Sequence, residues 1–212
     1  MKYYDDVKKF HDKFGLVTPS NFFLIPKDLH EFRVKFFKEE FTEYVESAET
    51  QDLPNAIDAL IDLVYITCGA ALLHGLTIFE PEPKQEQSEL FSESVVSPPK
   101  LLDLEAHNEL VFKLRMDIKR YQIFYEKNSE PGIQVSLSTL YQHCLDAAAA
   151  MGFNQPRWDM LWDDVQRANM TKERAVRADQ SKRGSTYDVF KPTGWVGPQT
   201  QAIVEMMVQG KA

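Results

Sequence analysis

The stretch "RVKFFKEEFTEYVESAETQDLPNAIDALIDLVYITCGAALLHG", from Arg33 to Gly75, decides the fold of this chain. Its apolar residues recur at helical spacing, and "ETQDLPN" in the middle has the composition of a turn. The pattern therefore predicts two long helices joined by a short connection. Five carboxylates lie within this apolar stretch: Glu39, Glu40, Glu43, Asp58 and Asp62. Ionised carboxylates are costly in a protein core unless they are paired or bind a cation, so these acids need a partner.

On the first of these helices, one glutamate falls inside the face that should be buried. The apolar stripe of the helix comprises Leu29, Phe32, Phe36, Phe37, Phe41, Tyr44 and Ala48. At about 100° per residue, Glu40 lies inside this stripe, and Glu39 and Glu43 lie on its edge. Arg33 also points into the stripe. We therefore expect Glu40 to be buried and either paired or bound to a metal ion.

The second helix is apolar almost all round from Ala56 to Leu73, as a fully buried helix would be. Asp58 and Asp62 are its only acids, and their i, i+4 spacing places them on one face. Stacked carboxylates repel each other unless a cation lies between them, and hard oxygen ligands suit Mg²⁺ or Mn²⁺. The alternative is a buried salt-bridge network in which three bases of the preceding helix neutralise the acids: Arg33, Lys35 and Lys38.

Helical periodicity extends over most of the remaining chain. The predicted helices are Tyr3–Phe14, the acid-bearing pair Asp28–Glu49 and Pro54–His74, then Leu101–Lys127, Val135–Met151 and one from Pro156 onward. A capping box of Asp28 and Glu31 should begin the first helix of the pair, and Gly75 should end the second. "TIFEPEPKQEQSELFSESVVSPPK" is predicted to be a long loop. Alternating strand patterns are absent apart from short fragments, so the sequence predicts an all-α fold.

Composition and charge argue against several classes of function. The net charge of −8 argues against a general nucleic-acid-binding surface. No run reaches the roughly 18 apolar residues of a membrane span, and "MKYYDDVKKFHDKFG" lacks the apolar stretch of a signal peptide. Cys68 and Cys144 lie in apolar helical patterns, which favours buried free thiols in a reducing cytosol. We therefore expect a cytoplasmic protein that binds neither nucleic acid nor membrane.

The charge is unevenly distributed along the chain. Residues 31–62 carry nine acids and three bases, whereas residues 165–191 carry seven bases and three acids. An acidic and a basic patch on one domain are suited to a metal ion and a phosphate, respectively. The alternative is that both are solvated helix faces, the basic one favoured by the helix dipole. That alternative applies above all to Arg174, Arg177 and Lys182.

The run "KEEFTEY…DALIDLVYITCGAAL" resembles the all-α nucleoside triphosphate pyrophosphohydrolases, the MazG-like group that includes phosphoribosyl-ATP pyrophosphatase and dimeric dUTPases. The signature of this group is Glu-x-x-Asp preceded, on another helix, by Glu-Glu-x-x-Glu. The first helix matches with Glu39, Glu40 and Glu43, and Asp62 matches the closing aspartate. Ala59 stands where the family has its fourth glutamate, and Asp58 is the candidate to supply the missing carboxylate.

Other pieces of the chain resemble the phage-type branch of this group. They are "FHDKFG" at Phe10, "FRVKFF" at Phe32, "RANMTK" at Arg167 and "FKPTGW" at Phe190. The resemblance implies a single domain over residues 1–212, a four-to-six-helix bundle of the all-α pyrophosphohydrolase type. In this interpretation, residues 77–134 are an insertion carrying an extra helix, and residues 184–212 form an irregular tail. A phage-encoded chain would act in the host cytoplasm.

The resemblance also assigns roles to residues. Metal ligands would be Glu40, Glu43, Asp58 and Asp62, holding Mg²⁺ or, as a substitute, Mn²⁺. The catalytic pair would be Glu39 and Glu40, with Glu39 orienting or deprotonating the attacking water. Substrate contacts would come from Asn169 and Lys172 at the triphosphate and from Lys191 and Trp195 in a segment covering the nucleotide. The implied reaction converts a nucleoside triphosphate, a deoxynucleotide such as dGTP being one candidate, to the monophosphate and pyrophosphate.

Family members pair their helices into symmetric oligomers, and a helix that is apolar all round needs partners, so a homodimer or homotetramer is predicted. The main alternative is a catalytically silent helical module whose acids only bind metal or a partner. His11-Asp12 resembles the dipeptide of HD-type phosphohydrolases, but the other histidines show no suitable grouping. Di-iron oxidases would need Glu-x-x-His, which the sequence lacks.

Overall fold

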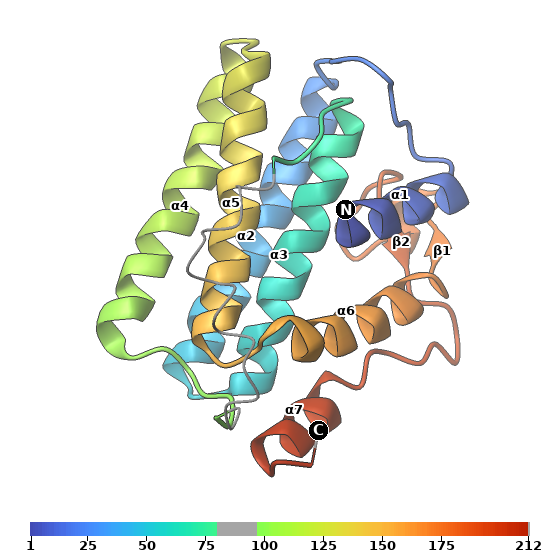
Figure 1. Cartoon of the computed structure of the whole chain (residues 1–212). Helices are drawn as coiled ribbons and strands as arrows, with labels where there is room; N and C mark the ends of the chain where they lie inside the picture. Colours follow the sequence, from blue (N-terminus) through green and yellow to red (C-terminus); the bar gives the residue numbers. More distant parts are fainter. Residues whose placement is uncertain (80–96, 212) are drawn as a thin grey trace.

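The computed structural model of the chain describes residues 1–79 and 97–211, and the regular secondary structure of these residues is almost entirely helical (Figure 1). The helices are α1 (Lys2–Phe14), α2 (Lys27–Glu49), α3 (Leu53–Leu73), α4 (Leu104–Glu126), α5 (Glu130–Ala150), α6 (Gln155–Asn169) and α7 (Thr200–Val208). A 3₁₀ turn, η2 (Ala178–Gln180), lies between the two short strands β1 (Glu173–Arg174) and β2 (Val189–Phe190), which pair antiparallel. The all-α prediction is confirmed.

Four long helices form a closed ring. In Figure 1, α2, α3, α5 and α4 stand side by side, and each packs against the next, with α4 returning to α2. Helices α1, α6 and α7 pack on the outside of this ring; α1 and α7 both contact α3. The helix predicted within residues 77–134 is therefore a wall of the bundle, because α4 contacts both α2 and α5.

Helix α3 is the centre of the core. Nearly all its apolar side chains are buried, and its N-terminus is capped by Asp52, which accepts a hydrogen bond from the backbone N–H of Asn55 at 3.1 Å. Pro54 lies in the first turn, where its missing N–H costs nothing. Among the described helices only α3 is long and apolar enough to cross a membrane, and 89% of its apolar window is buried inside the bundle. Both cysteines are buried and free, as predicted.

Helix ends follow the sequence signals in part. Gly75 ends α3 at a φ of 66°, and a Cβ there would lie 2.2 Å from the carbonyl oxygen of Asn21, so only glycine fits. The predicted capping box at Asp28 and Glu31 is wrong. Helix α2 begins one residue earlier, after Pro26, without a side-chain cap, because the proline already fixes an extended entry to the helix.

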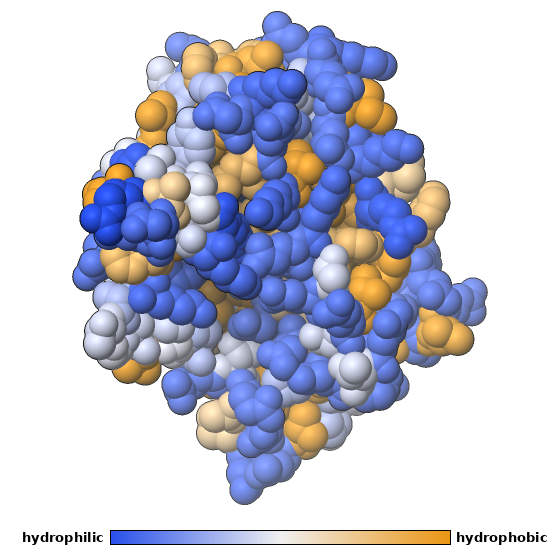
Figure 2. All heavy atoms as spheres, turned by 180° about the vertical axis from the view of Figure 1, so that it is seen from behind, coloured by the Kyte–Doolittle hydropathy of each residue, from blue (hydrophilic) through white to orange (hydrophobic). Residues whose placement is uncertain are grey.

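The prediction of an irregular tail from residue 184 is also wrong in part. The tail contains β2 and the two-turn helix α7, whose Val204 and Met207 are buried. Helix α5 begins at Glu130, not Val135, because Ser129 caps it. The helix predicted from Pro156 ends at Asn169. Seen from behind, the surface is mainly hydrophilic, with small hydrophobic patches between charged residues (Figure 2).

Candidate active site

A cavity of about 490 Å³ opens between α1, α2, α3 and the segment that follows α6. Its polar part is lined by Glu39, Glu40, Glu43, Asp58, Asp62, Asn169, Lys172, Lys182, Arg183, Asp188 and Lys191. A second part, farther along α2 and α3, is lined by His11, Phe32, Arg33, Phe36, Ile66, Gly69 and Tyr187. The fold therefore brings together every site residue predicted from the sequence except Trp195.

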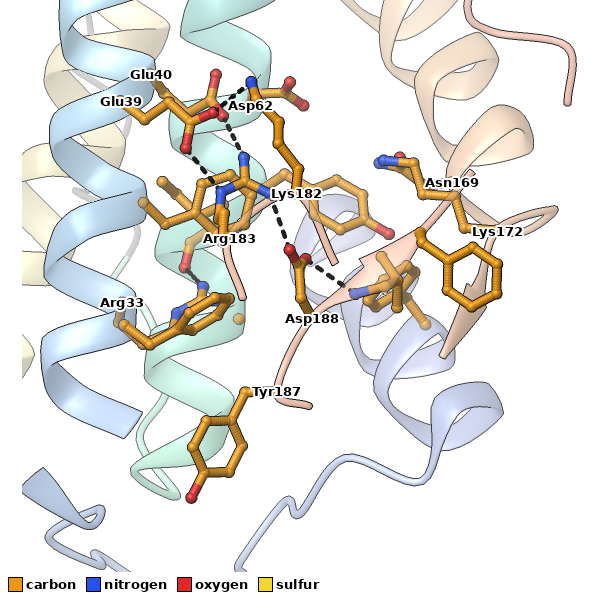
Figure 3. A pocket seen from close by; sticks show the side chains of 18 of the residues that line it. Arg33, Glu39, Glu40, Asp62, Asn169, Lys172, Lys182, Arg183, Tyr187 and Asp188 are labelled. Atoms are coloured by element: carbon orange, nitrogen blue, oxygen red, sulfur yellow. Dashed lines mark hydrogen bonds and ion pairs between the residues drawn. The ribbon is translucent and has the colours of Figure 1, made fainter. Parts of the chain in front are cut away.

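Two cations from the C-terminal segment hold the glutamates of α2. Lys182 donates a hydrogen bond of 2.8 Å to Glu39 Oε1, and Arg183 Nε donates one of 2.7 Å to Glu39 Oε2 (Figure 3). The Arg183 guanidinium also lies 3.5 Å from Glu40 Oε1 and stacks on the ring of Phe36, 3.7 Å from its centroid. Burial alone would raise the pKa of Glu39, but the bonds from Lys182 and Arg183 lower it below its usual value.

Arg183 is itself fixed by a small polar network that the sequence did not single out. Asp188 accepts a hydrogen bond of 2.7 Å from the hydroxyl of Ser181 and one of 3.3 Å from Arg183 Nη1. Asp188 is buried, and its carbonyl oxygen accepts the backbone N–H of Ala175 beside the β1–β2 pair. The short strands and this network therefore position Arg183 over the acids.

The remaining carboxylates repel one another. Glu40 is buried with an exposed fraction of 4%, and its Oε2 has no hydrogen-bond partner. Burial, followed by the charges of Asp62 and Glu43, raises the pKa of Glu40. Burial and the charge of Asp58 likewise raise the pKa of Asp62. Asp58 accepts a hydrogen bond of 2.8 Å from the hydroxyl of Thr200 in α7. Of the five carboxylates, Arg183 and Lys182 therefore pair only with Glu39 and Glu40.

The donor set suits a hard divalent cation, because all its ligating atoms are carboxylate oxygens and Glu40 Oε2 lies buried without a partner. In the present arrangement, no three acids, histidines or cysteines of the described residues converge closely enough to enclose a metal ion. Glu39 and Glu40 are engaged by Arg183 instead. The residues therefore fit Mg²⁺ by chemistry, and binding it requires the acids to draw together.

The salt-bridge alternative named bases that do not pair with the acids in the structure; Glu39 and Glu40 pair with Lys182 and Arg183 instead. Lys35 and Lys38 are exposed and outside the cavity. Arg33 is buried, and its guanidinium donates a hydrogen bond to the carbonyl oxygen of Ile66 in α3. The bases that pair with Glu39 lie 143 and 144 residues further along the chain, so helical periodicity could not reveal them.

Asn169 and Lys172 face the acids from the opposite wall (Figure 3). Asn169 is buried at the end of α6. Burial lowers the pKa of Lys172, and the negative charge of Asp62 opposes this shift. Trp195 does not line the cavity; its indole N–H donates to the carbonyl oxygen of Ala168 at 3.0 Å. Its ring supports two ammonium groups, at 5.6 Å from Lys172 and 4.5 Å from Lys191.

Other basic residues of this region serve the fold. Arg174 donates hydrogen bonds to the carbonyl oxygens of Phe14 and Gly15, which ties the C-terminal segment to α1. Arg177 forms an exposed ion pair with Asp179. Trp158 and Trp162 of α6 are buried in the core.

Comparison with known proteins agrees with the geometry. The family model for phosphoribosyl-ATP pyrophosphohydrolase matches residues 7–88, which include α2, α3 and all five acids. No curated protein and no solved structure matches the chain. The matched family is one of nucleotide pyrophosphohydrolases, and the acids of α2 and α3 lie within the matched segment. Over residues 7–88 the chain is thus similar to the phosphoribosyl-ATP pyrophosphohydrolase family, which belongs to the MazG-like superfamily of nucleoside triphosphate pyrophosphohydrolases.

Proposed function

We propose that this chain is a Mg²⁺-dependent hydrolase that cleaves a deoxynucleoside triphosphate between the α- and β-phosphates. The products are the nucleoside monophosphate and pyrophosphate. One observation carries this proposal: a single cavity holds under-neutralised carboxylates of α2 and α3 opposite cations from a segment more than 100 residues away. Acids alone suit a metal ion, and acids facing Lys172, Lys182, Arg183 and Lys191 suit a metal ion together with a polyphosphate.

The acids and cations divide the work between them. Glu40, Glu43, Asp58 and Asp62 would hold Mg²⁺, which when bound neutralises phosphate charge and lowers the pKa of a water. Lys172 would offer its partly buried positive charge to the phosphates, and the buried Asn169 beside it would donate hydrogen bonds. These groups stabilise the negative charge that moves onto the leaving pyrophosphate.

Glu39 is the residue we propose as general base. While Lys182 and Arg183 bind it, its lowered pKa makes it a poor proton acceptor. Phosphate oxygens compete for the same two cations, because Arg and Lys bind phosphate as well as carboxylate. Binding of the triphosphate would therefore release Glu39, restore its basicity and allow it to take a proton from the attacking water. Substrate binding and activation of the base are thus coupled.

Pyrophosphate release from a panel of deoxynucleoside triphosphates, with and without Mg²⁺, tests this function. Wild type should release pyrophosphate from at least one of them only with the metal. Glu43→Gln and Asp62→Asn should lose turnover while their circular dichroism stays that of wild type. Glu46→Gln, an exposed acid of α2 outside the cavity, is the matched control and should keep full activity. Turnover within a few-fold of wild type in Asp62→Asn would refute the metal site.

A wild-type protein that binds nucleotide or metal and releases no pyrophosphate from any member of the panel would instead be the silent helical module. The assay thus separates the enzyme from the binding module. The phage-type origin, the choice of dGTP and the homodimeric or homotetrameric assembly stay predictions.

A further inference from the structure

The second part of the cavity contains two buried polar groups that the hydrolysis of phosphates does not use. Arg33 is 8% exposed and His11 is 2% exposed, yet both line the cavity. Arg33 Nε and His11 Nδ1 have no hydrogen-bond partner. A buried donor or acceptor without a partner is costly, so such a group inside a cavity points to a ligand that completes it.

The backbone is built to admit these two side chains. Gly69 of α3 lies where Arg33 and His11 meet: a Cβ there would be 2.9 Å from Arg33 Nη2 and 3.2 Å from His11 Nε2. A glycine in the middle of a core helix weakens the helix relative to alanine. The space it leaves is occupied by the guanidinium and the imidazole. Gly69 therefore makes room for both side chains where α1, α2 and α3 meet.

The walls around this pair are aromatic. Phe32 and Phe36 of α2 lie with ring centroids 6.1 Å apart, and Tyr187 lies 6.3 Å from Phe32. Tyr187 is held in place by a hydrogen bond of 2.9 Å from its hydroxyl to Asp28. Aromatic rings can pack against the face of a planar heterocycle, and this contact forms with any nucleobase.

The position along the helices fits a nucleoside. Arg33 precedes Glu40 by seven residues, and Gly69 follows Asp62 by seven residues. Two helical turns, roughly 10 Å, therefore separate this pair from the carboxylates on both α2 and α3. If the sugar of a nucleotide lies on the side of the carboxylates, the opposite edge of the base faces Arg33 and His11. This edge carries C6 of a purine or C4 of a pyrimidine.

The hydrogen-bonding character of the pair selects one kind of edge. Burial lowers the pKa of Arg33 to about 10, so it stays charged at neutral pH and can only donate. Burial and the charge of Arg33 lower the pKa of His11 to about 3, so the neutral ring keeps one nitrogen that accepts. A donor beside an acceptor matches a keto oxygen beside a ring N–H. The edge of adenine or cytosine, an amino group beside a bare ring nitrogen, presents the opposite order.

We infer that Arg33 and His11 read the base of the substrate and select a keto base, namely guanine, hypoxanthine, uracil or thymine. The inference rests on the proposed function, because it places the base of the same nucleotide. Arg33 binds the keto oxygen, His11 accepts the ring N–H, and the rings of Phe32 and Tyr187 supply apolar contacts to the base. Adenine and cytosine would place an amino donor against the Arg33 donor and a bare ring nitrogen against the His11 acceptor. Neither contact forms a hydrogen bond.

Two pairs of nucleotides test this, because their members differ only at the edge in question: dITP against dATP, and dUTP against dCTP. Whether the cavity accepts purines or pyrimidines, kcat/KM within the accepted pair should be roughly 10- to 100-fold higher for the keto nucleotide. This ratio corresponds to one buried charged hydrogen bond that the amino nucleotide cannot form. Equal values within threefold, or preference for the amino member, would overturn the inference.

Arg33→Met should bring the ratio within each pair close to one, whereas Lys35→Met, which removes an exposed charge two residues away, should leave the ratio unchanged. A keto preference that survives in folded Arg33→Met would overturn the role of Arg33. Should Arg33→Met fail to fold, the wild-type comparison of the two pairs still decides the base preference.

Equilibrium binding of the metal-free protein to dIMP, dAMP, dUMP and dCMP separates this inference from the proposed function. Keto-selective binding without pyrophosphate release from any triphosphate would retain the base site and refute the hydrolase. Pyrophosphate release without keto selectivity in either assay would retain the hydrolase and refute the base site.

Discussion

Replacement of Gly69 by alanine is the sharpest test of how α3 accommodates Arg33. In an ordinary helix interior, glycine to alanine stabilises a protein by about 1 kcal/mol. Here the added methyl would lie 2.9 Å from Arg33 Nη2 and 3.2 Å from His11 Nε2. The guanidinium must therefore move away, and its hydrogen bond to the carbonyl oxygen of Ile66 is lost.

The two effects have opposite signs, and their sizes decide the outcome. A hydrogen bond from a charged, buried donor contributes about 1.5–3 kcal/mol, which exceeds the helix-propensity gain of about 1 kcal/mol. Gly69→Ala should therefore lower the free energy of unfolding by about 0.5–2 kcal/mol. In an Arg33→Met background the guanidinium is absent, so the same substitution should be neutral or stabilise by up to about 1 kcal/mol.

Urea unfolding of the four members of this cycle, followed by far-UV circular dichroism, measures the coupling between the two positions. The coupling energy should be about 0.5–3 kcal/mol. If Gly69→Ala stabilises the otherwise unchanged protein by about 1 kcal/mol, as at an unremarkable helix position, the close approach of Arg33 to α3 is refuted. A coupling energy near zero would refute it equally.

Three further predictions concern Lys172, the stability of the fold at acid pH and the oligomeric state. Lys172→Ala should weaken triphosphate binding by roughly 10- to 100-fold, and Trp195 fluorescence should respond to nucleotide plus Mg²⁺ more than to Mg²⁺ alone; unchanged triphosphate affinity would assign Lys172 to the fold. Burial lowers the pKa of His11 to about 3 and that of His74 to about 4, whereas a histidine in the unfolded chain has a pKa of about 6.5. Between about pH 4 and pH 6.5 the unfolded state therefore binds more protons than the folded state. The free energy of unfolding should therefore fall as pH drops from about 6.5 to 4, less steeply in His11→Gln; an equal slope in both proteins would contradict this. Sedimentation equilibrium should give at least twice the mass of one chain, and the mass of a single chain would contradict the predicted dimer.

The structure changes the reason for expecting a dimer. Helix α3 is apolar all round, and the sequence alone suggested that a second chain was needed to cover it. Within one chain, however, α1, α2, α5 and α7 all pack against α3. The apolar surface of α3 therefore gives no reason to expect a dimer, and the family resemblance alone supports the assembly.

The acidic half of the site could be predicted from the sequence because periodicity reports on local geometry. Residues on one helix have fixed angular relations, so Glu40 in an apolar stripe is recognisable as a buried carboxylate, and Asp58 and Asp62 as a stacked pair. The same reasoning placed α3 in the core. It needed no knowledge of how the helices pack.

The basic half was only partly predictable, for a physical reason. Lys182 and Arg183 lie in a loop after β1, and no period relates them to Glu39. Their role depends on where the chain returns after α6, which the pairing of β1 with β2 and the network at Asp188 determine. Strands of two residues are too short to leave an alternating pattern. The tail was therefore predicted as irregular, and α7 was missed.

The wide separation of the two cavity walls has a consequence for the order of folding. The acidic wall comes from a hairpin of adjacent helices, which forms by local contacts, whereas Glu39 meets Lys182 across 143 residues. During synthesis the carboxylates therefore emerge long before their cations. Refolding from denaturant should accordingly be biphasic, with helical signal returning first. Nucleotide binding should return only when the last thirty or so residues have packed against the helices. During refolding, the helical bundle should therefore form before the ability to bind nucleotide.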